Sequence, residues 1–166
     1  MNIKIGVSAC LLGQKVRYDG GHKHDPFITD TLGRQFEFVP VCPESEAGLG
    51  IPREPMRLTG DPASPCLVTI DTGIDHTYLM LRWAGMRVSG LEAEGLCGFI
   101  FKARSPSCGM EVEVFTEDGK PAGFGAGLFA KAFMERFPHL PVLDEDGLHE
   151  TGASEEFVRM ASEVLR

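Results

Sequence analysis

Short apolar runs recur along the chain. Residues 3–7, 37–41 and 97–101 are the clearest, and residues 66–70 and 140–143 follow the same pattern. Each run is short and tightly bounded, which favours a buried strand over a helix. We therefore expect at least five strands.

Segments with apolar side chains at helical spacing lie between these runs. Residues 77–94 and 124–137 carry an apolar stripe with charged residues beside it, and residues 154–164 repeat the pattern. Residues 25–32 open with an Asp-Pro pair, a favourable helix start. The pattern predicts a helix in each of these four segments.

Strands that alternate with helices are typical of a parallel sheet with helices on both faces. We therefore predict a single domain over residues 1–166, an α/β fold with one Rossmann-like, doubly wound, mostly parallel sheet. Residues 111–115, followed by a turn at 117–119, predict a hairpin and hence a small β-rich insertion. Residues 45–65 are rich in Gly and Pro, and we expect a long irregular loop with a functional role.

Composition and charge narrow the class of protein. The chain has 166 residues, 43% hydrophobic and 24% charged, which is typical of a globular domain. No apolar run approaches the ~20 residues of a membrane span, and the first residues lack a signal peptide's apolar stretch, so we expect a cytoplasmic protein without a membrane partner. The net charge of −8 argues against a large nucleic-acid footprint and leaves room only for a local basic pocket. A small-molecule enzyme is the natural expectation.

Three of the five cysteines follow expected strands. Cys10, Cys42 and Cys108 each lie at a strand-to-loop junction. If the strands are parallel, these thiols share the carboxyl edge of the sheet, where open α/β sheets bind ligands. Cys66 and Cys97 instead open apolar runs and are expected in the core. An odd cysteine count in a reducing compartment argues against a disulfide framework.

The chemistry at this edge admits several interpretations. The cysteine spacing matches no local metal motif, but three thiolates without an obvious fourth ligand would leave the open position of a catalytic metal site. Glu44, close behind Cys42, is a candidate general acid or base. Ser105 and Ser107 can donate hydrogen bonds to a small ligand or simply shape their turn, and Asp19 is a weaker candidate of the same kind.

Several motifs, taken together, resemble the thiouracil desulfidase (desulfurase) family. They occupy residues 8–13, 17–20, 41–44, 48–55, 75–77 and 105–109. The resemblance covers the chain from about residue 3 to residue 150. It implies a [4Fe-4S] cluster held by Cys10, Cys42 and Cys108, with one iron left to bind the sulfur of a thiolated uracil. It also implies catalytic roles for Glu44 and Ser105.

The resulting hypothesis is a [4Fe-4S]-dependent, non-redox desulfuration of a thiolated uracil base or nucleoside, in which C=S becomes C=O and sulfide is released. Sulfur is a soft donor that suits iron, and iron polarises the C=S bond while a water activated by Glu44 attacks the carbon. Ser105 is the second expected catalytic residue, and Asp19 and Ser107 are expected to bind substrate. The expected partners are a thiolated pyrimidine and the cluster-assembly machinery; the oligomeric state is left open.

Three alternatives use the same cysteines. One is a zinc-dependent hydrolase with three thiolates and a water on the metal. Another is an iron–sulfur or sulfur carrier, a binding module in which Glu44 and Ser105 only shape the pocket. The third is thiol redox chemistry, which the long spacing between the cysteines disfavours.

Overall fold

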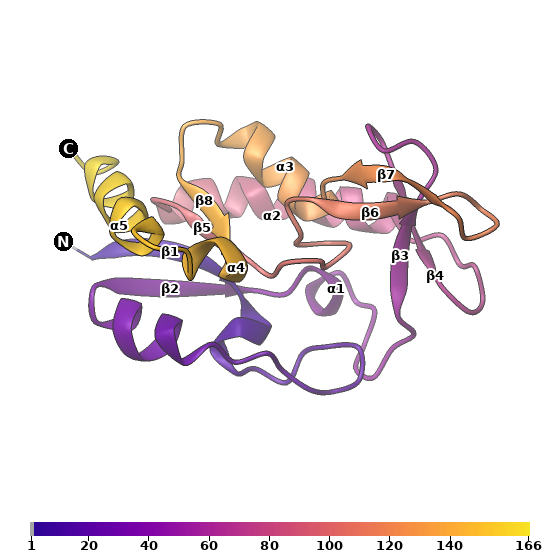
Figure 1. Ribbon diagram of the computed structural model, residues 1–166, viewed down its shortest axis with the longest axis horizontal. Helices are drawn as coiled ribbons and strands as arrows, with labels where there is room; N and C mark the ends of the chain where they lie inside the picture. The colour runs from indigo at the N-terminus through magenta and orange to yellow at the C-terminus, as the bar shows by residue number, and fades with distance from the viewer. Residues whose placement is uncertain (1) are drawn as a thin grey trace.

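Four parallel strands form the sheet on which the site is built. The computed structural model describes residues 2–166 (Figure 1). The strands are β1 (Ile3–Ser8), β2 (Phe36–Val41), β5 (Phe99–Phe101) and β8 (Val142–Asp144). They pair in the order β2-β1-β5-β8, and every pairing is parallel. The carboxyl ends of all four strands therefore meet at one edge.

A second, mixed sheet is inserted into the connections of the first. Its strands are β3 (Met56–Thr59), β4 (Cys66–Thr69), β6 (Val112–Phe115) and β7 (Pro121–Gly125), in the order β4-β3-β6-β7. Two antiparallel hairpins join through a parallel β3–β6 pairing. Figure 1 shows this sheet at one end of the molecule, opposite the two termini. It is the β-rich insertion that the sequence predicted.

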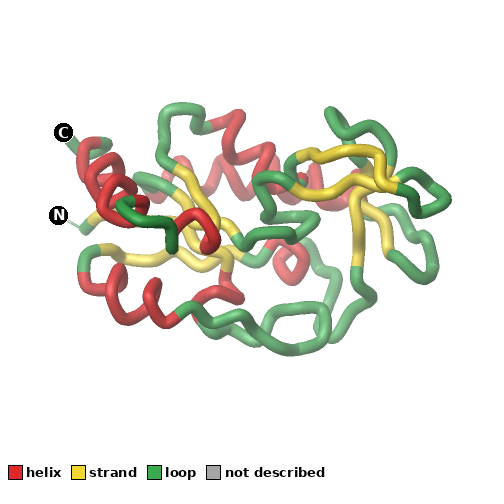
Figure 2. The backbone as a smooth tube through the Cα atoms, in the orientation of Figure 1, coloured by secondary structure: helices red, strands yellow, loops and turns green. Residues whose placement is uncertain are grey.

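Helices cover both faces of the parallel sheet (Figure 2). The longer ones are α2 (Thr77–Glu94), α3 (Leu128–Arg136) and α5 (Ala153–Glu163), and the short ones are η1 (Ala9–Leu12), η2 (Phe27–Thr31), η3 (Leu32–Arg34), α1 (Pro43–Glu46) and α4 (Glu145–Leu148). One core contains residues of α2 and α3, and the other contains residues of η2, η3 and α5. The predicted α/β class, with a doubly wound, mostly parallel sheet, is confirmed. Within residues 2–166, no helix has the length and apolar character that a membrane crossing requires.

Aromatic side chains from β5 fill the core on the α2–α3 face. Phe99 and Phe101 are fully buried, and their ring centroids lie 4.3 Å apart. The Phe133 ring of α3 lies 4.9 Å from that of Phe99. Each such aromatic pair contributes about 0.5–1.5 kcal/mol beyond the area it buries. Gly6 of β1 lies beneath Phe99, because a Cβ there would come within 2.3 Å of the ring.

Three local expectations were wrong in detail. The segment 45–65 is not wholly irregular, since it contains part of α1 and all of β3. Helix α3 starts at Leu128 rather than at residue 124, because Phe124 and its neighbours pair with β6. The last helix starts at Ala153 rather than at residue 154, and Gly152, with φ 80°, occupies its N-cap position. In the second case pairing with the preceding strand overrides a helical pattern.

The start of α3 packs directly on the Cys108 loop. The amide of Gly127 donates to the carbonyl of Gly109 at 2.8 Å, and the amides of Phe129 and Ala130 donate to the carbonyl of Ser107 at 3.0 and 3.1 Å. These amides are therefore used by the loop, and the glycine-rich start of the helix serves close packing rather than anion binding.

Replacing Gly127 with alanine tests this packing. A Cβ at Gly127 would lie 2.6 Å from the carbonyl carbon of Ser107, so Gly127→Ala should lower the free energy of unfolding by about 1–3 kcal/mol. Gly85→Ala in α2 is the matched control, because a Cβ there meets open space; it should be neutral or stabilising by up to about 1 kcal/mol. Urea unfolding of both variants measures the difference, and equal effects would contradict the account.

Candidate metal-cluster site

The parallel topology brings three thiols to one cavity. Cys42 follows β2, Cys10 follows β1 and Cys108 lies in the loop after β5, so the thiols come from three adjacent strands. All three line a cavity of about 430 Å³. The predicted meeting of the three thiols at the sheet edge is confirmed, while their role as ligands stays a prediction.

Burial makes the Cys10 and Cys108 thiols hold their protons. Burial raises the pKa of the Cys10 thiol to about 11, although the charges of Lys102 and Arg17 lower it. Burial also raises the pKa of Cys108 well above its ordinary value, and the neighbouring Cys10 and Cys42 add to that effect. Three thiolates would therefore be unfavourable here without a cation to hold them.

The two remaining cysteines lie elsewhere. Cys97 is completely buried in the core on the α5 face, and Cys66 is half-buried on β4 in the second sheet. Neither lines the cavity, and all five cysteines are free. In the described part of the chain, no three Cys, His, Asp or Glu side chains are grouped closely enough to hold one metal ion. The three cavity thiols surround a space instead of converging on a single point.

Ser105 organises the loop that presents Cys108. Its hydroxyl oxygen accepts hydrogen bonds from the amide of Cys108 at 3.0 Å and the amide of Ser107 at 3.3 Å. Arg104 turns the chain into this loop with a φ of 65°, in the left-handed region. The Ser105 side chain also lines the cavity. Because its oxygen only accepts in these bonds, its proton remains available to a ligand.

Both carboxylate oxygens of Glu44 are held by partners. The Nε of Arg53 donates to Oε1 at 3.0 Å, and the hydroxyl of Ser107 donates to Oε2 at 3.0 Å. The Arg53 side chain is only 7% exposed, and it also donates to the carbonyls of Val16 at 2.7 Å and Gly50 at 2.9 Å. Arg53 thus fixes Glu44 on the cavity wall and joins it to two loops.

The two expected substrate-binding residues do not line the cavity. Ser107 is completely buried behind Glu44, and Asp19 is exposed, with its Oδ1 accepting the amide of Gly21 in its own loop at 2.9 Å. Their role in substrate binding stays a prediction. Sequence reasoning missed Arg53; the available signal was a single arginine inside the Gly- and Pro-rich motif at residues 48–55.

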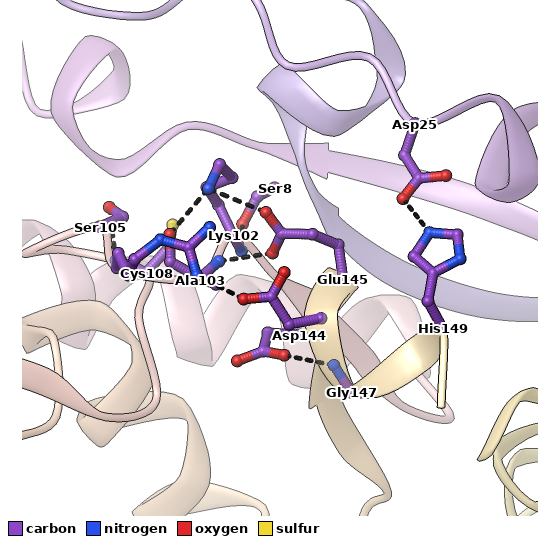
Figure 3. Close-up of polar contacts among 12 residues, drawn as sticks. Ser8, Asp25, Lys102, Ala103, Ser105, Cys108, Asp144, Glu145, Gly147 and His149 are labelled. Atoms are coloured by element: carbon purple, nitrogen blue, oxygen red, sulfur yellow. Dashed lines mark hydrogen bonds and ion pairs between the residues drawn. The ribbon is translucent and has the colours of Figure 1, made fainter. Parts of the chain in front are cut away.

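Lys102, which also lines the cavity, is held by an ion pair with Glu145. The ammonium of Lys102 lies 2.8 Å from Oε2 of Glu145, and the amide of Ala103 donates to Oε1 at 2.6 Å (Figure 3). The Glu145 side chain belongs to α4, whose first turn is capped by Asp144 through the amide of Gly147 at 2.8 Å. The sequence patterns did not single out this pair.

Two further cations line the cavity without an acidic partner. Within residues 2–166, neither Arg17 nor Lys23 forms an ion pair, and Nε of Arg17 is buried without a hydrogen-bond partner. The amide of Lys23 donates to the carbonyl of Cys10 at 3.0 Å, which keeps this residue beside the thiols. The cavity is therefore locally positive in a chain whose net charge is −8.

Known proteins match this chain over most of its length. The family model described as 2-thiouracil desulfurase matches residues 5–145. A solved structure described as the [4Fe-4S]-dependent thiouracil desulfidase TudS is 33% identical, with a TM-score of 0.74 over 93% of this chain and 99% of that chain. Protein YbbK of Bacillus subtilis (strain 168) is 31% identical over 108 residues, which is 62% of this chain and 71% of YbbK. The extent of the family match confirms the resemblance seen in the sequence: the chain belongs to the 2-thiouracil desulfurase family.

Proposed function

We propose that the protein is a [4Fe-4S]-dependent thiouracil desulfidase. It replaces the sulfur of a thiolated uracil with oxygen from water and releases the sulfur as sulfide. The observation that carries the proposal is the gathering of three thiols, a fixed carboxylate and a hydroxyl around one cavity. Membership of the family and the similarity to TudS support the same reaction.

The donor set fits a cluster better than a single zinc ion. Iron–sulfur clusters are held by cysteine thiolates, and Cys10, Cys42 and Cys108 are the thiols that line the cavity; the lining contains no fourth cysteine and no histidine in the described chain. No three donors there are grouped to hold a single ion, whereas a cluster of several irons spans thiols set around a space. When bound, the cluster supplies a Lewis-acidic iron with affinity for the soft sulfur of a C=S bond.

Glu44 is the residue best placed for proton transfer. Arg53 and Ser107 hold its two oxygens in fixed positions at the cavity wall, so the carboxylate is oriented before a substrate arrives. In our account it takes one proton from the attacking water as the C–O bond forms and the C=S double bond opens to a single bond. The C–S bond then breaks with its electron pair on sulfur, the second water proton leaves the oxygen so that C=O forms, and the two protons end on the released sulfur as hydrogen sulfide. The carbon keeps its oxidation level, so the step needs no external electron donor.

Ser105 completes the site as a hydrogen-bond donor. Ser105 lines the cavity, and its hydroxyl oxygen is fixed by two amides of its own loop. We expect it to orient the pyrimidine ring so that the reacting carbon meets the water held by Glu44.

The cations Arg17 and Lys23 indicate the form of the substrate. Their charges have no acidic partner among residues 2–166, and the buried Nε of Arg17 is a donor without an acceptor. Such groups favour an anionic substituent, which a nucleoside 5′-monophosphate carries and a free base does not. Intact thiolated tRNA should be a poor substrate, because the chain as a whole is acidic.

The first prediction concerns the cluster ligands. Cys10→Ala, Cys42→Ala and Cys108→Ala should each lose the cluster after anaerobic reconstitution, because two protein ligands do not suffice. Cys66→Ala and Cys97→Ala are the matched controls and should keep it, with a packing loss of about 1–2 kcal/mol. Iron and sulfide analysis of the five variants shows which cysteines the cluster requires. Loss of iron in a control variant, with retention in a cavity variant, would refute the assignment.

The second prediction concerns Glu44. Glutamine has nearly the same shape but takes up no proton, so Glu44→Gln should keep its iron and lose about 10²–10⁴-fold in kcat. Glu113→Gln, an exposed change on β6, should leave both unchanged. Steady-state kinetics on cluster-replete protein provides the measurement. Near-normal turnover would remove Glu44 from the mechanism, and loss of iron would make it a structural support.

The third prediction concerns the substrate's charge. A hydrogen bond to a charged group contributes about 1.5–3 kcal/mol, so the KM for 4-thiouridine 5′-monophosphate should be lower than that for 4-thiouridine by roughly 10- to 150-fold. Lys23→Gln should reduce the difference between the two KM values, whereas Lys15→Gln, outside the cavity lining, should not. Equal KM values for the two substrates would show that the cations do not select a phosphate.

A further inference from the structure

The ion pair between Lys102 and Glu145 does more than anchor α4 to the loop after β5. The amide of Ala103 already anchors the helix, because it donates to Glu145 at 2.6 Å. The Lys102 ammonium additionally contacts Glu145 at 2.8 Å and the carbonyl of Ala103 at 2.8 Å. Both charged side chains are largely buried, with 12% and 13% exposed. Burying two charges is costly unless their geometry and additional hydrogen bonds compensate the lost hydration.

Three contacts hold Lys102 rigidly at the cavity. Its backbone amide donates to the hydroxyl of Ser8 at 2.9 Å, at the end of β1, while its side chain is held by Glu145 and Ala103 (Figure 3). Lys102 lines the cavity that contains the three cysteines. A lysine on a long flexible stem is thereby converted into a charge with a fixed position.

The charges of the pair reach the thiols. Lys102 lines the cavity together with Cys10, Cys42 and Cys108, and Glu145 lies 2.8 Å from its ammonium, so both charges act close to the thiols. Three thiolates around one cavity concentrate negative charge, and a fixed ammonium offsets part of it. The net charge around an iron–sulfur cluster is one of the factors that set its reduction potential.

We propose that Lys102 is a positioning residue whose charge, fixed by Glu145, raises the reduction potential of the thiolate-bound cluster. This inference rests on the proposed function. It assigns to Lys102 and Glu145 effects of opposite sign: the ammonium makes the site more electrophilic toward sulfur, and the carboxylate makes it less so. A purely structural pair would have no such signed effect.

The midpoint potential of the cluster tests the inference in an anaerobic one-electron titration. Lys102→Met should shift the potential to more negative values, Lys102→Arg should keep it, and Glu145→Gln should shift it to more positive values. The glutamine still offers an oxygen to the amide of Ala103, which protects the local fold. Lys131→Met and Glu135→Gln are charge-matched controls on α3, outside the cavity lining, and should leave the potential unchanged.

Unchanged potentials in Lys102→Met and Glu145→Gln, or shifts of the same sign in both, would overturn the inference while leaving the proposed function intact. Iron analysis of the unmodified protein separates the two claims. If the unmodified protein binds no cluster, the proposed function fails and this inference falls with it. Opposite shifts with normal iron content in all variants are the result that supports both.

Discussion

The parallel pairing of β1 with β2 on one side and β5 on the other is the interaction on which the site depends. The register sets Ser8 opposite Val41, and Val7 opposite Ile100. The three strands therefore end together, and the residues that follow them meet. No single segment carries a metal motif; the topology assembles the thiols. The packing of Phe99 between Gly6 and the α3 aromatic side chains holds this pairing from one face.

Burial of Cys10 and Cys108 determines what kind of ligand the cavity can bind. Burial disfavours the thiolate forms of Cys10 and Cys108, so thiolates there need a compensating cation, and metal binding releases their protons. Two ion pairs fix the charged side chains around the thiols. Arg53 neutralises Glu44, and Lys102 pairs with Glu145 close to the thiols.

The sequence predicted what depends on local pattern and missed what depends on distant contacts. Strand ends, the fold class and the grouping of the thiols follow from short apolar runs and from the rule that parallel strands end at one edge. The partners of Glu44 do not, because Ser107 lies 63 positions away in the chain, and Glu145 lies 42 positions from Ala103. Net charge also concealed the basic cavity, since Arg17 and Lys23 stand out only when their lack of acidic partners is known. The helix expected from residue 124 began too early for a different reason, because residues 121–125 form a hairpin with β6, which the helical spacing of apolar residues does not reveal.

The most direct test of the central claim is the origin of the oxygen in the product. Cluster-replete protein would be incubated anaerobically with a thiolated uracil substrate in isotopically labelled water, without any reductant, and the uracil and sulfide would be quantified. Our account predicts a labelled oxygen in each uracil formed, an equal amount of sulfide, and no conversion by protein stripped of its cluster. Conversion that requires an external electron donor, or that proceeds equally well without the cluster, would contradict it.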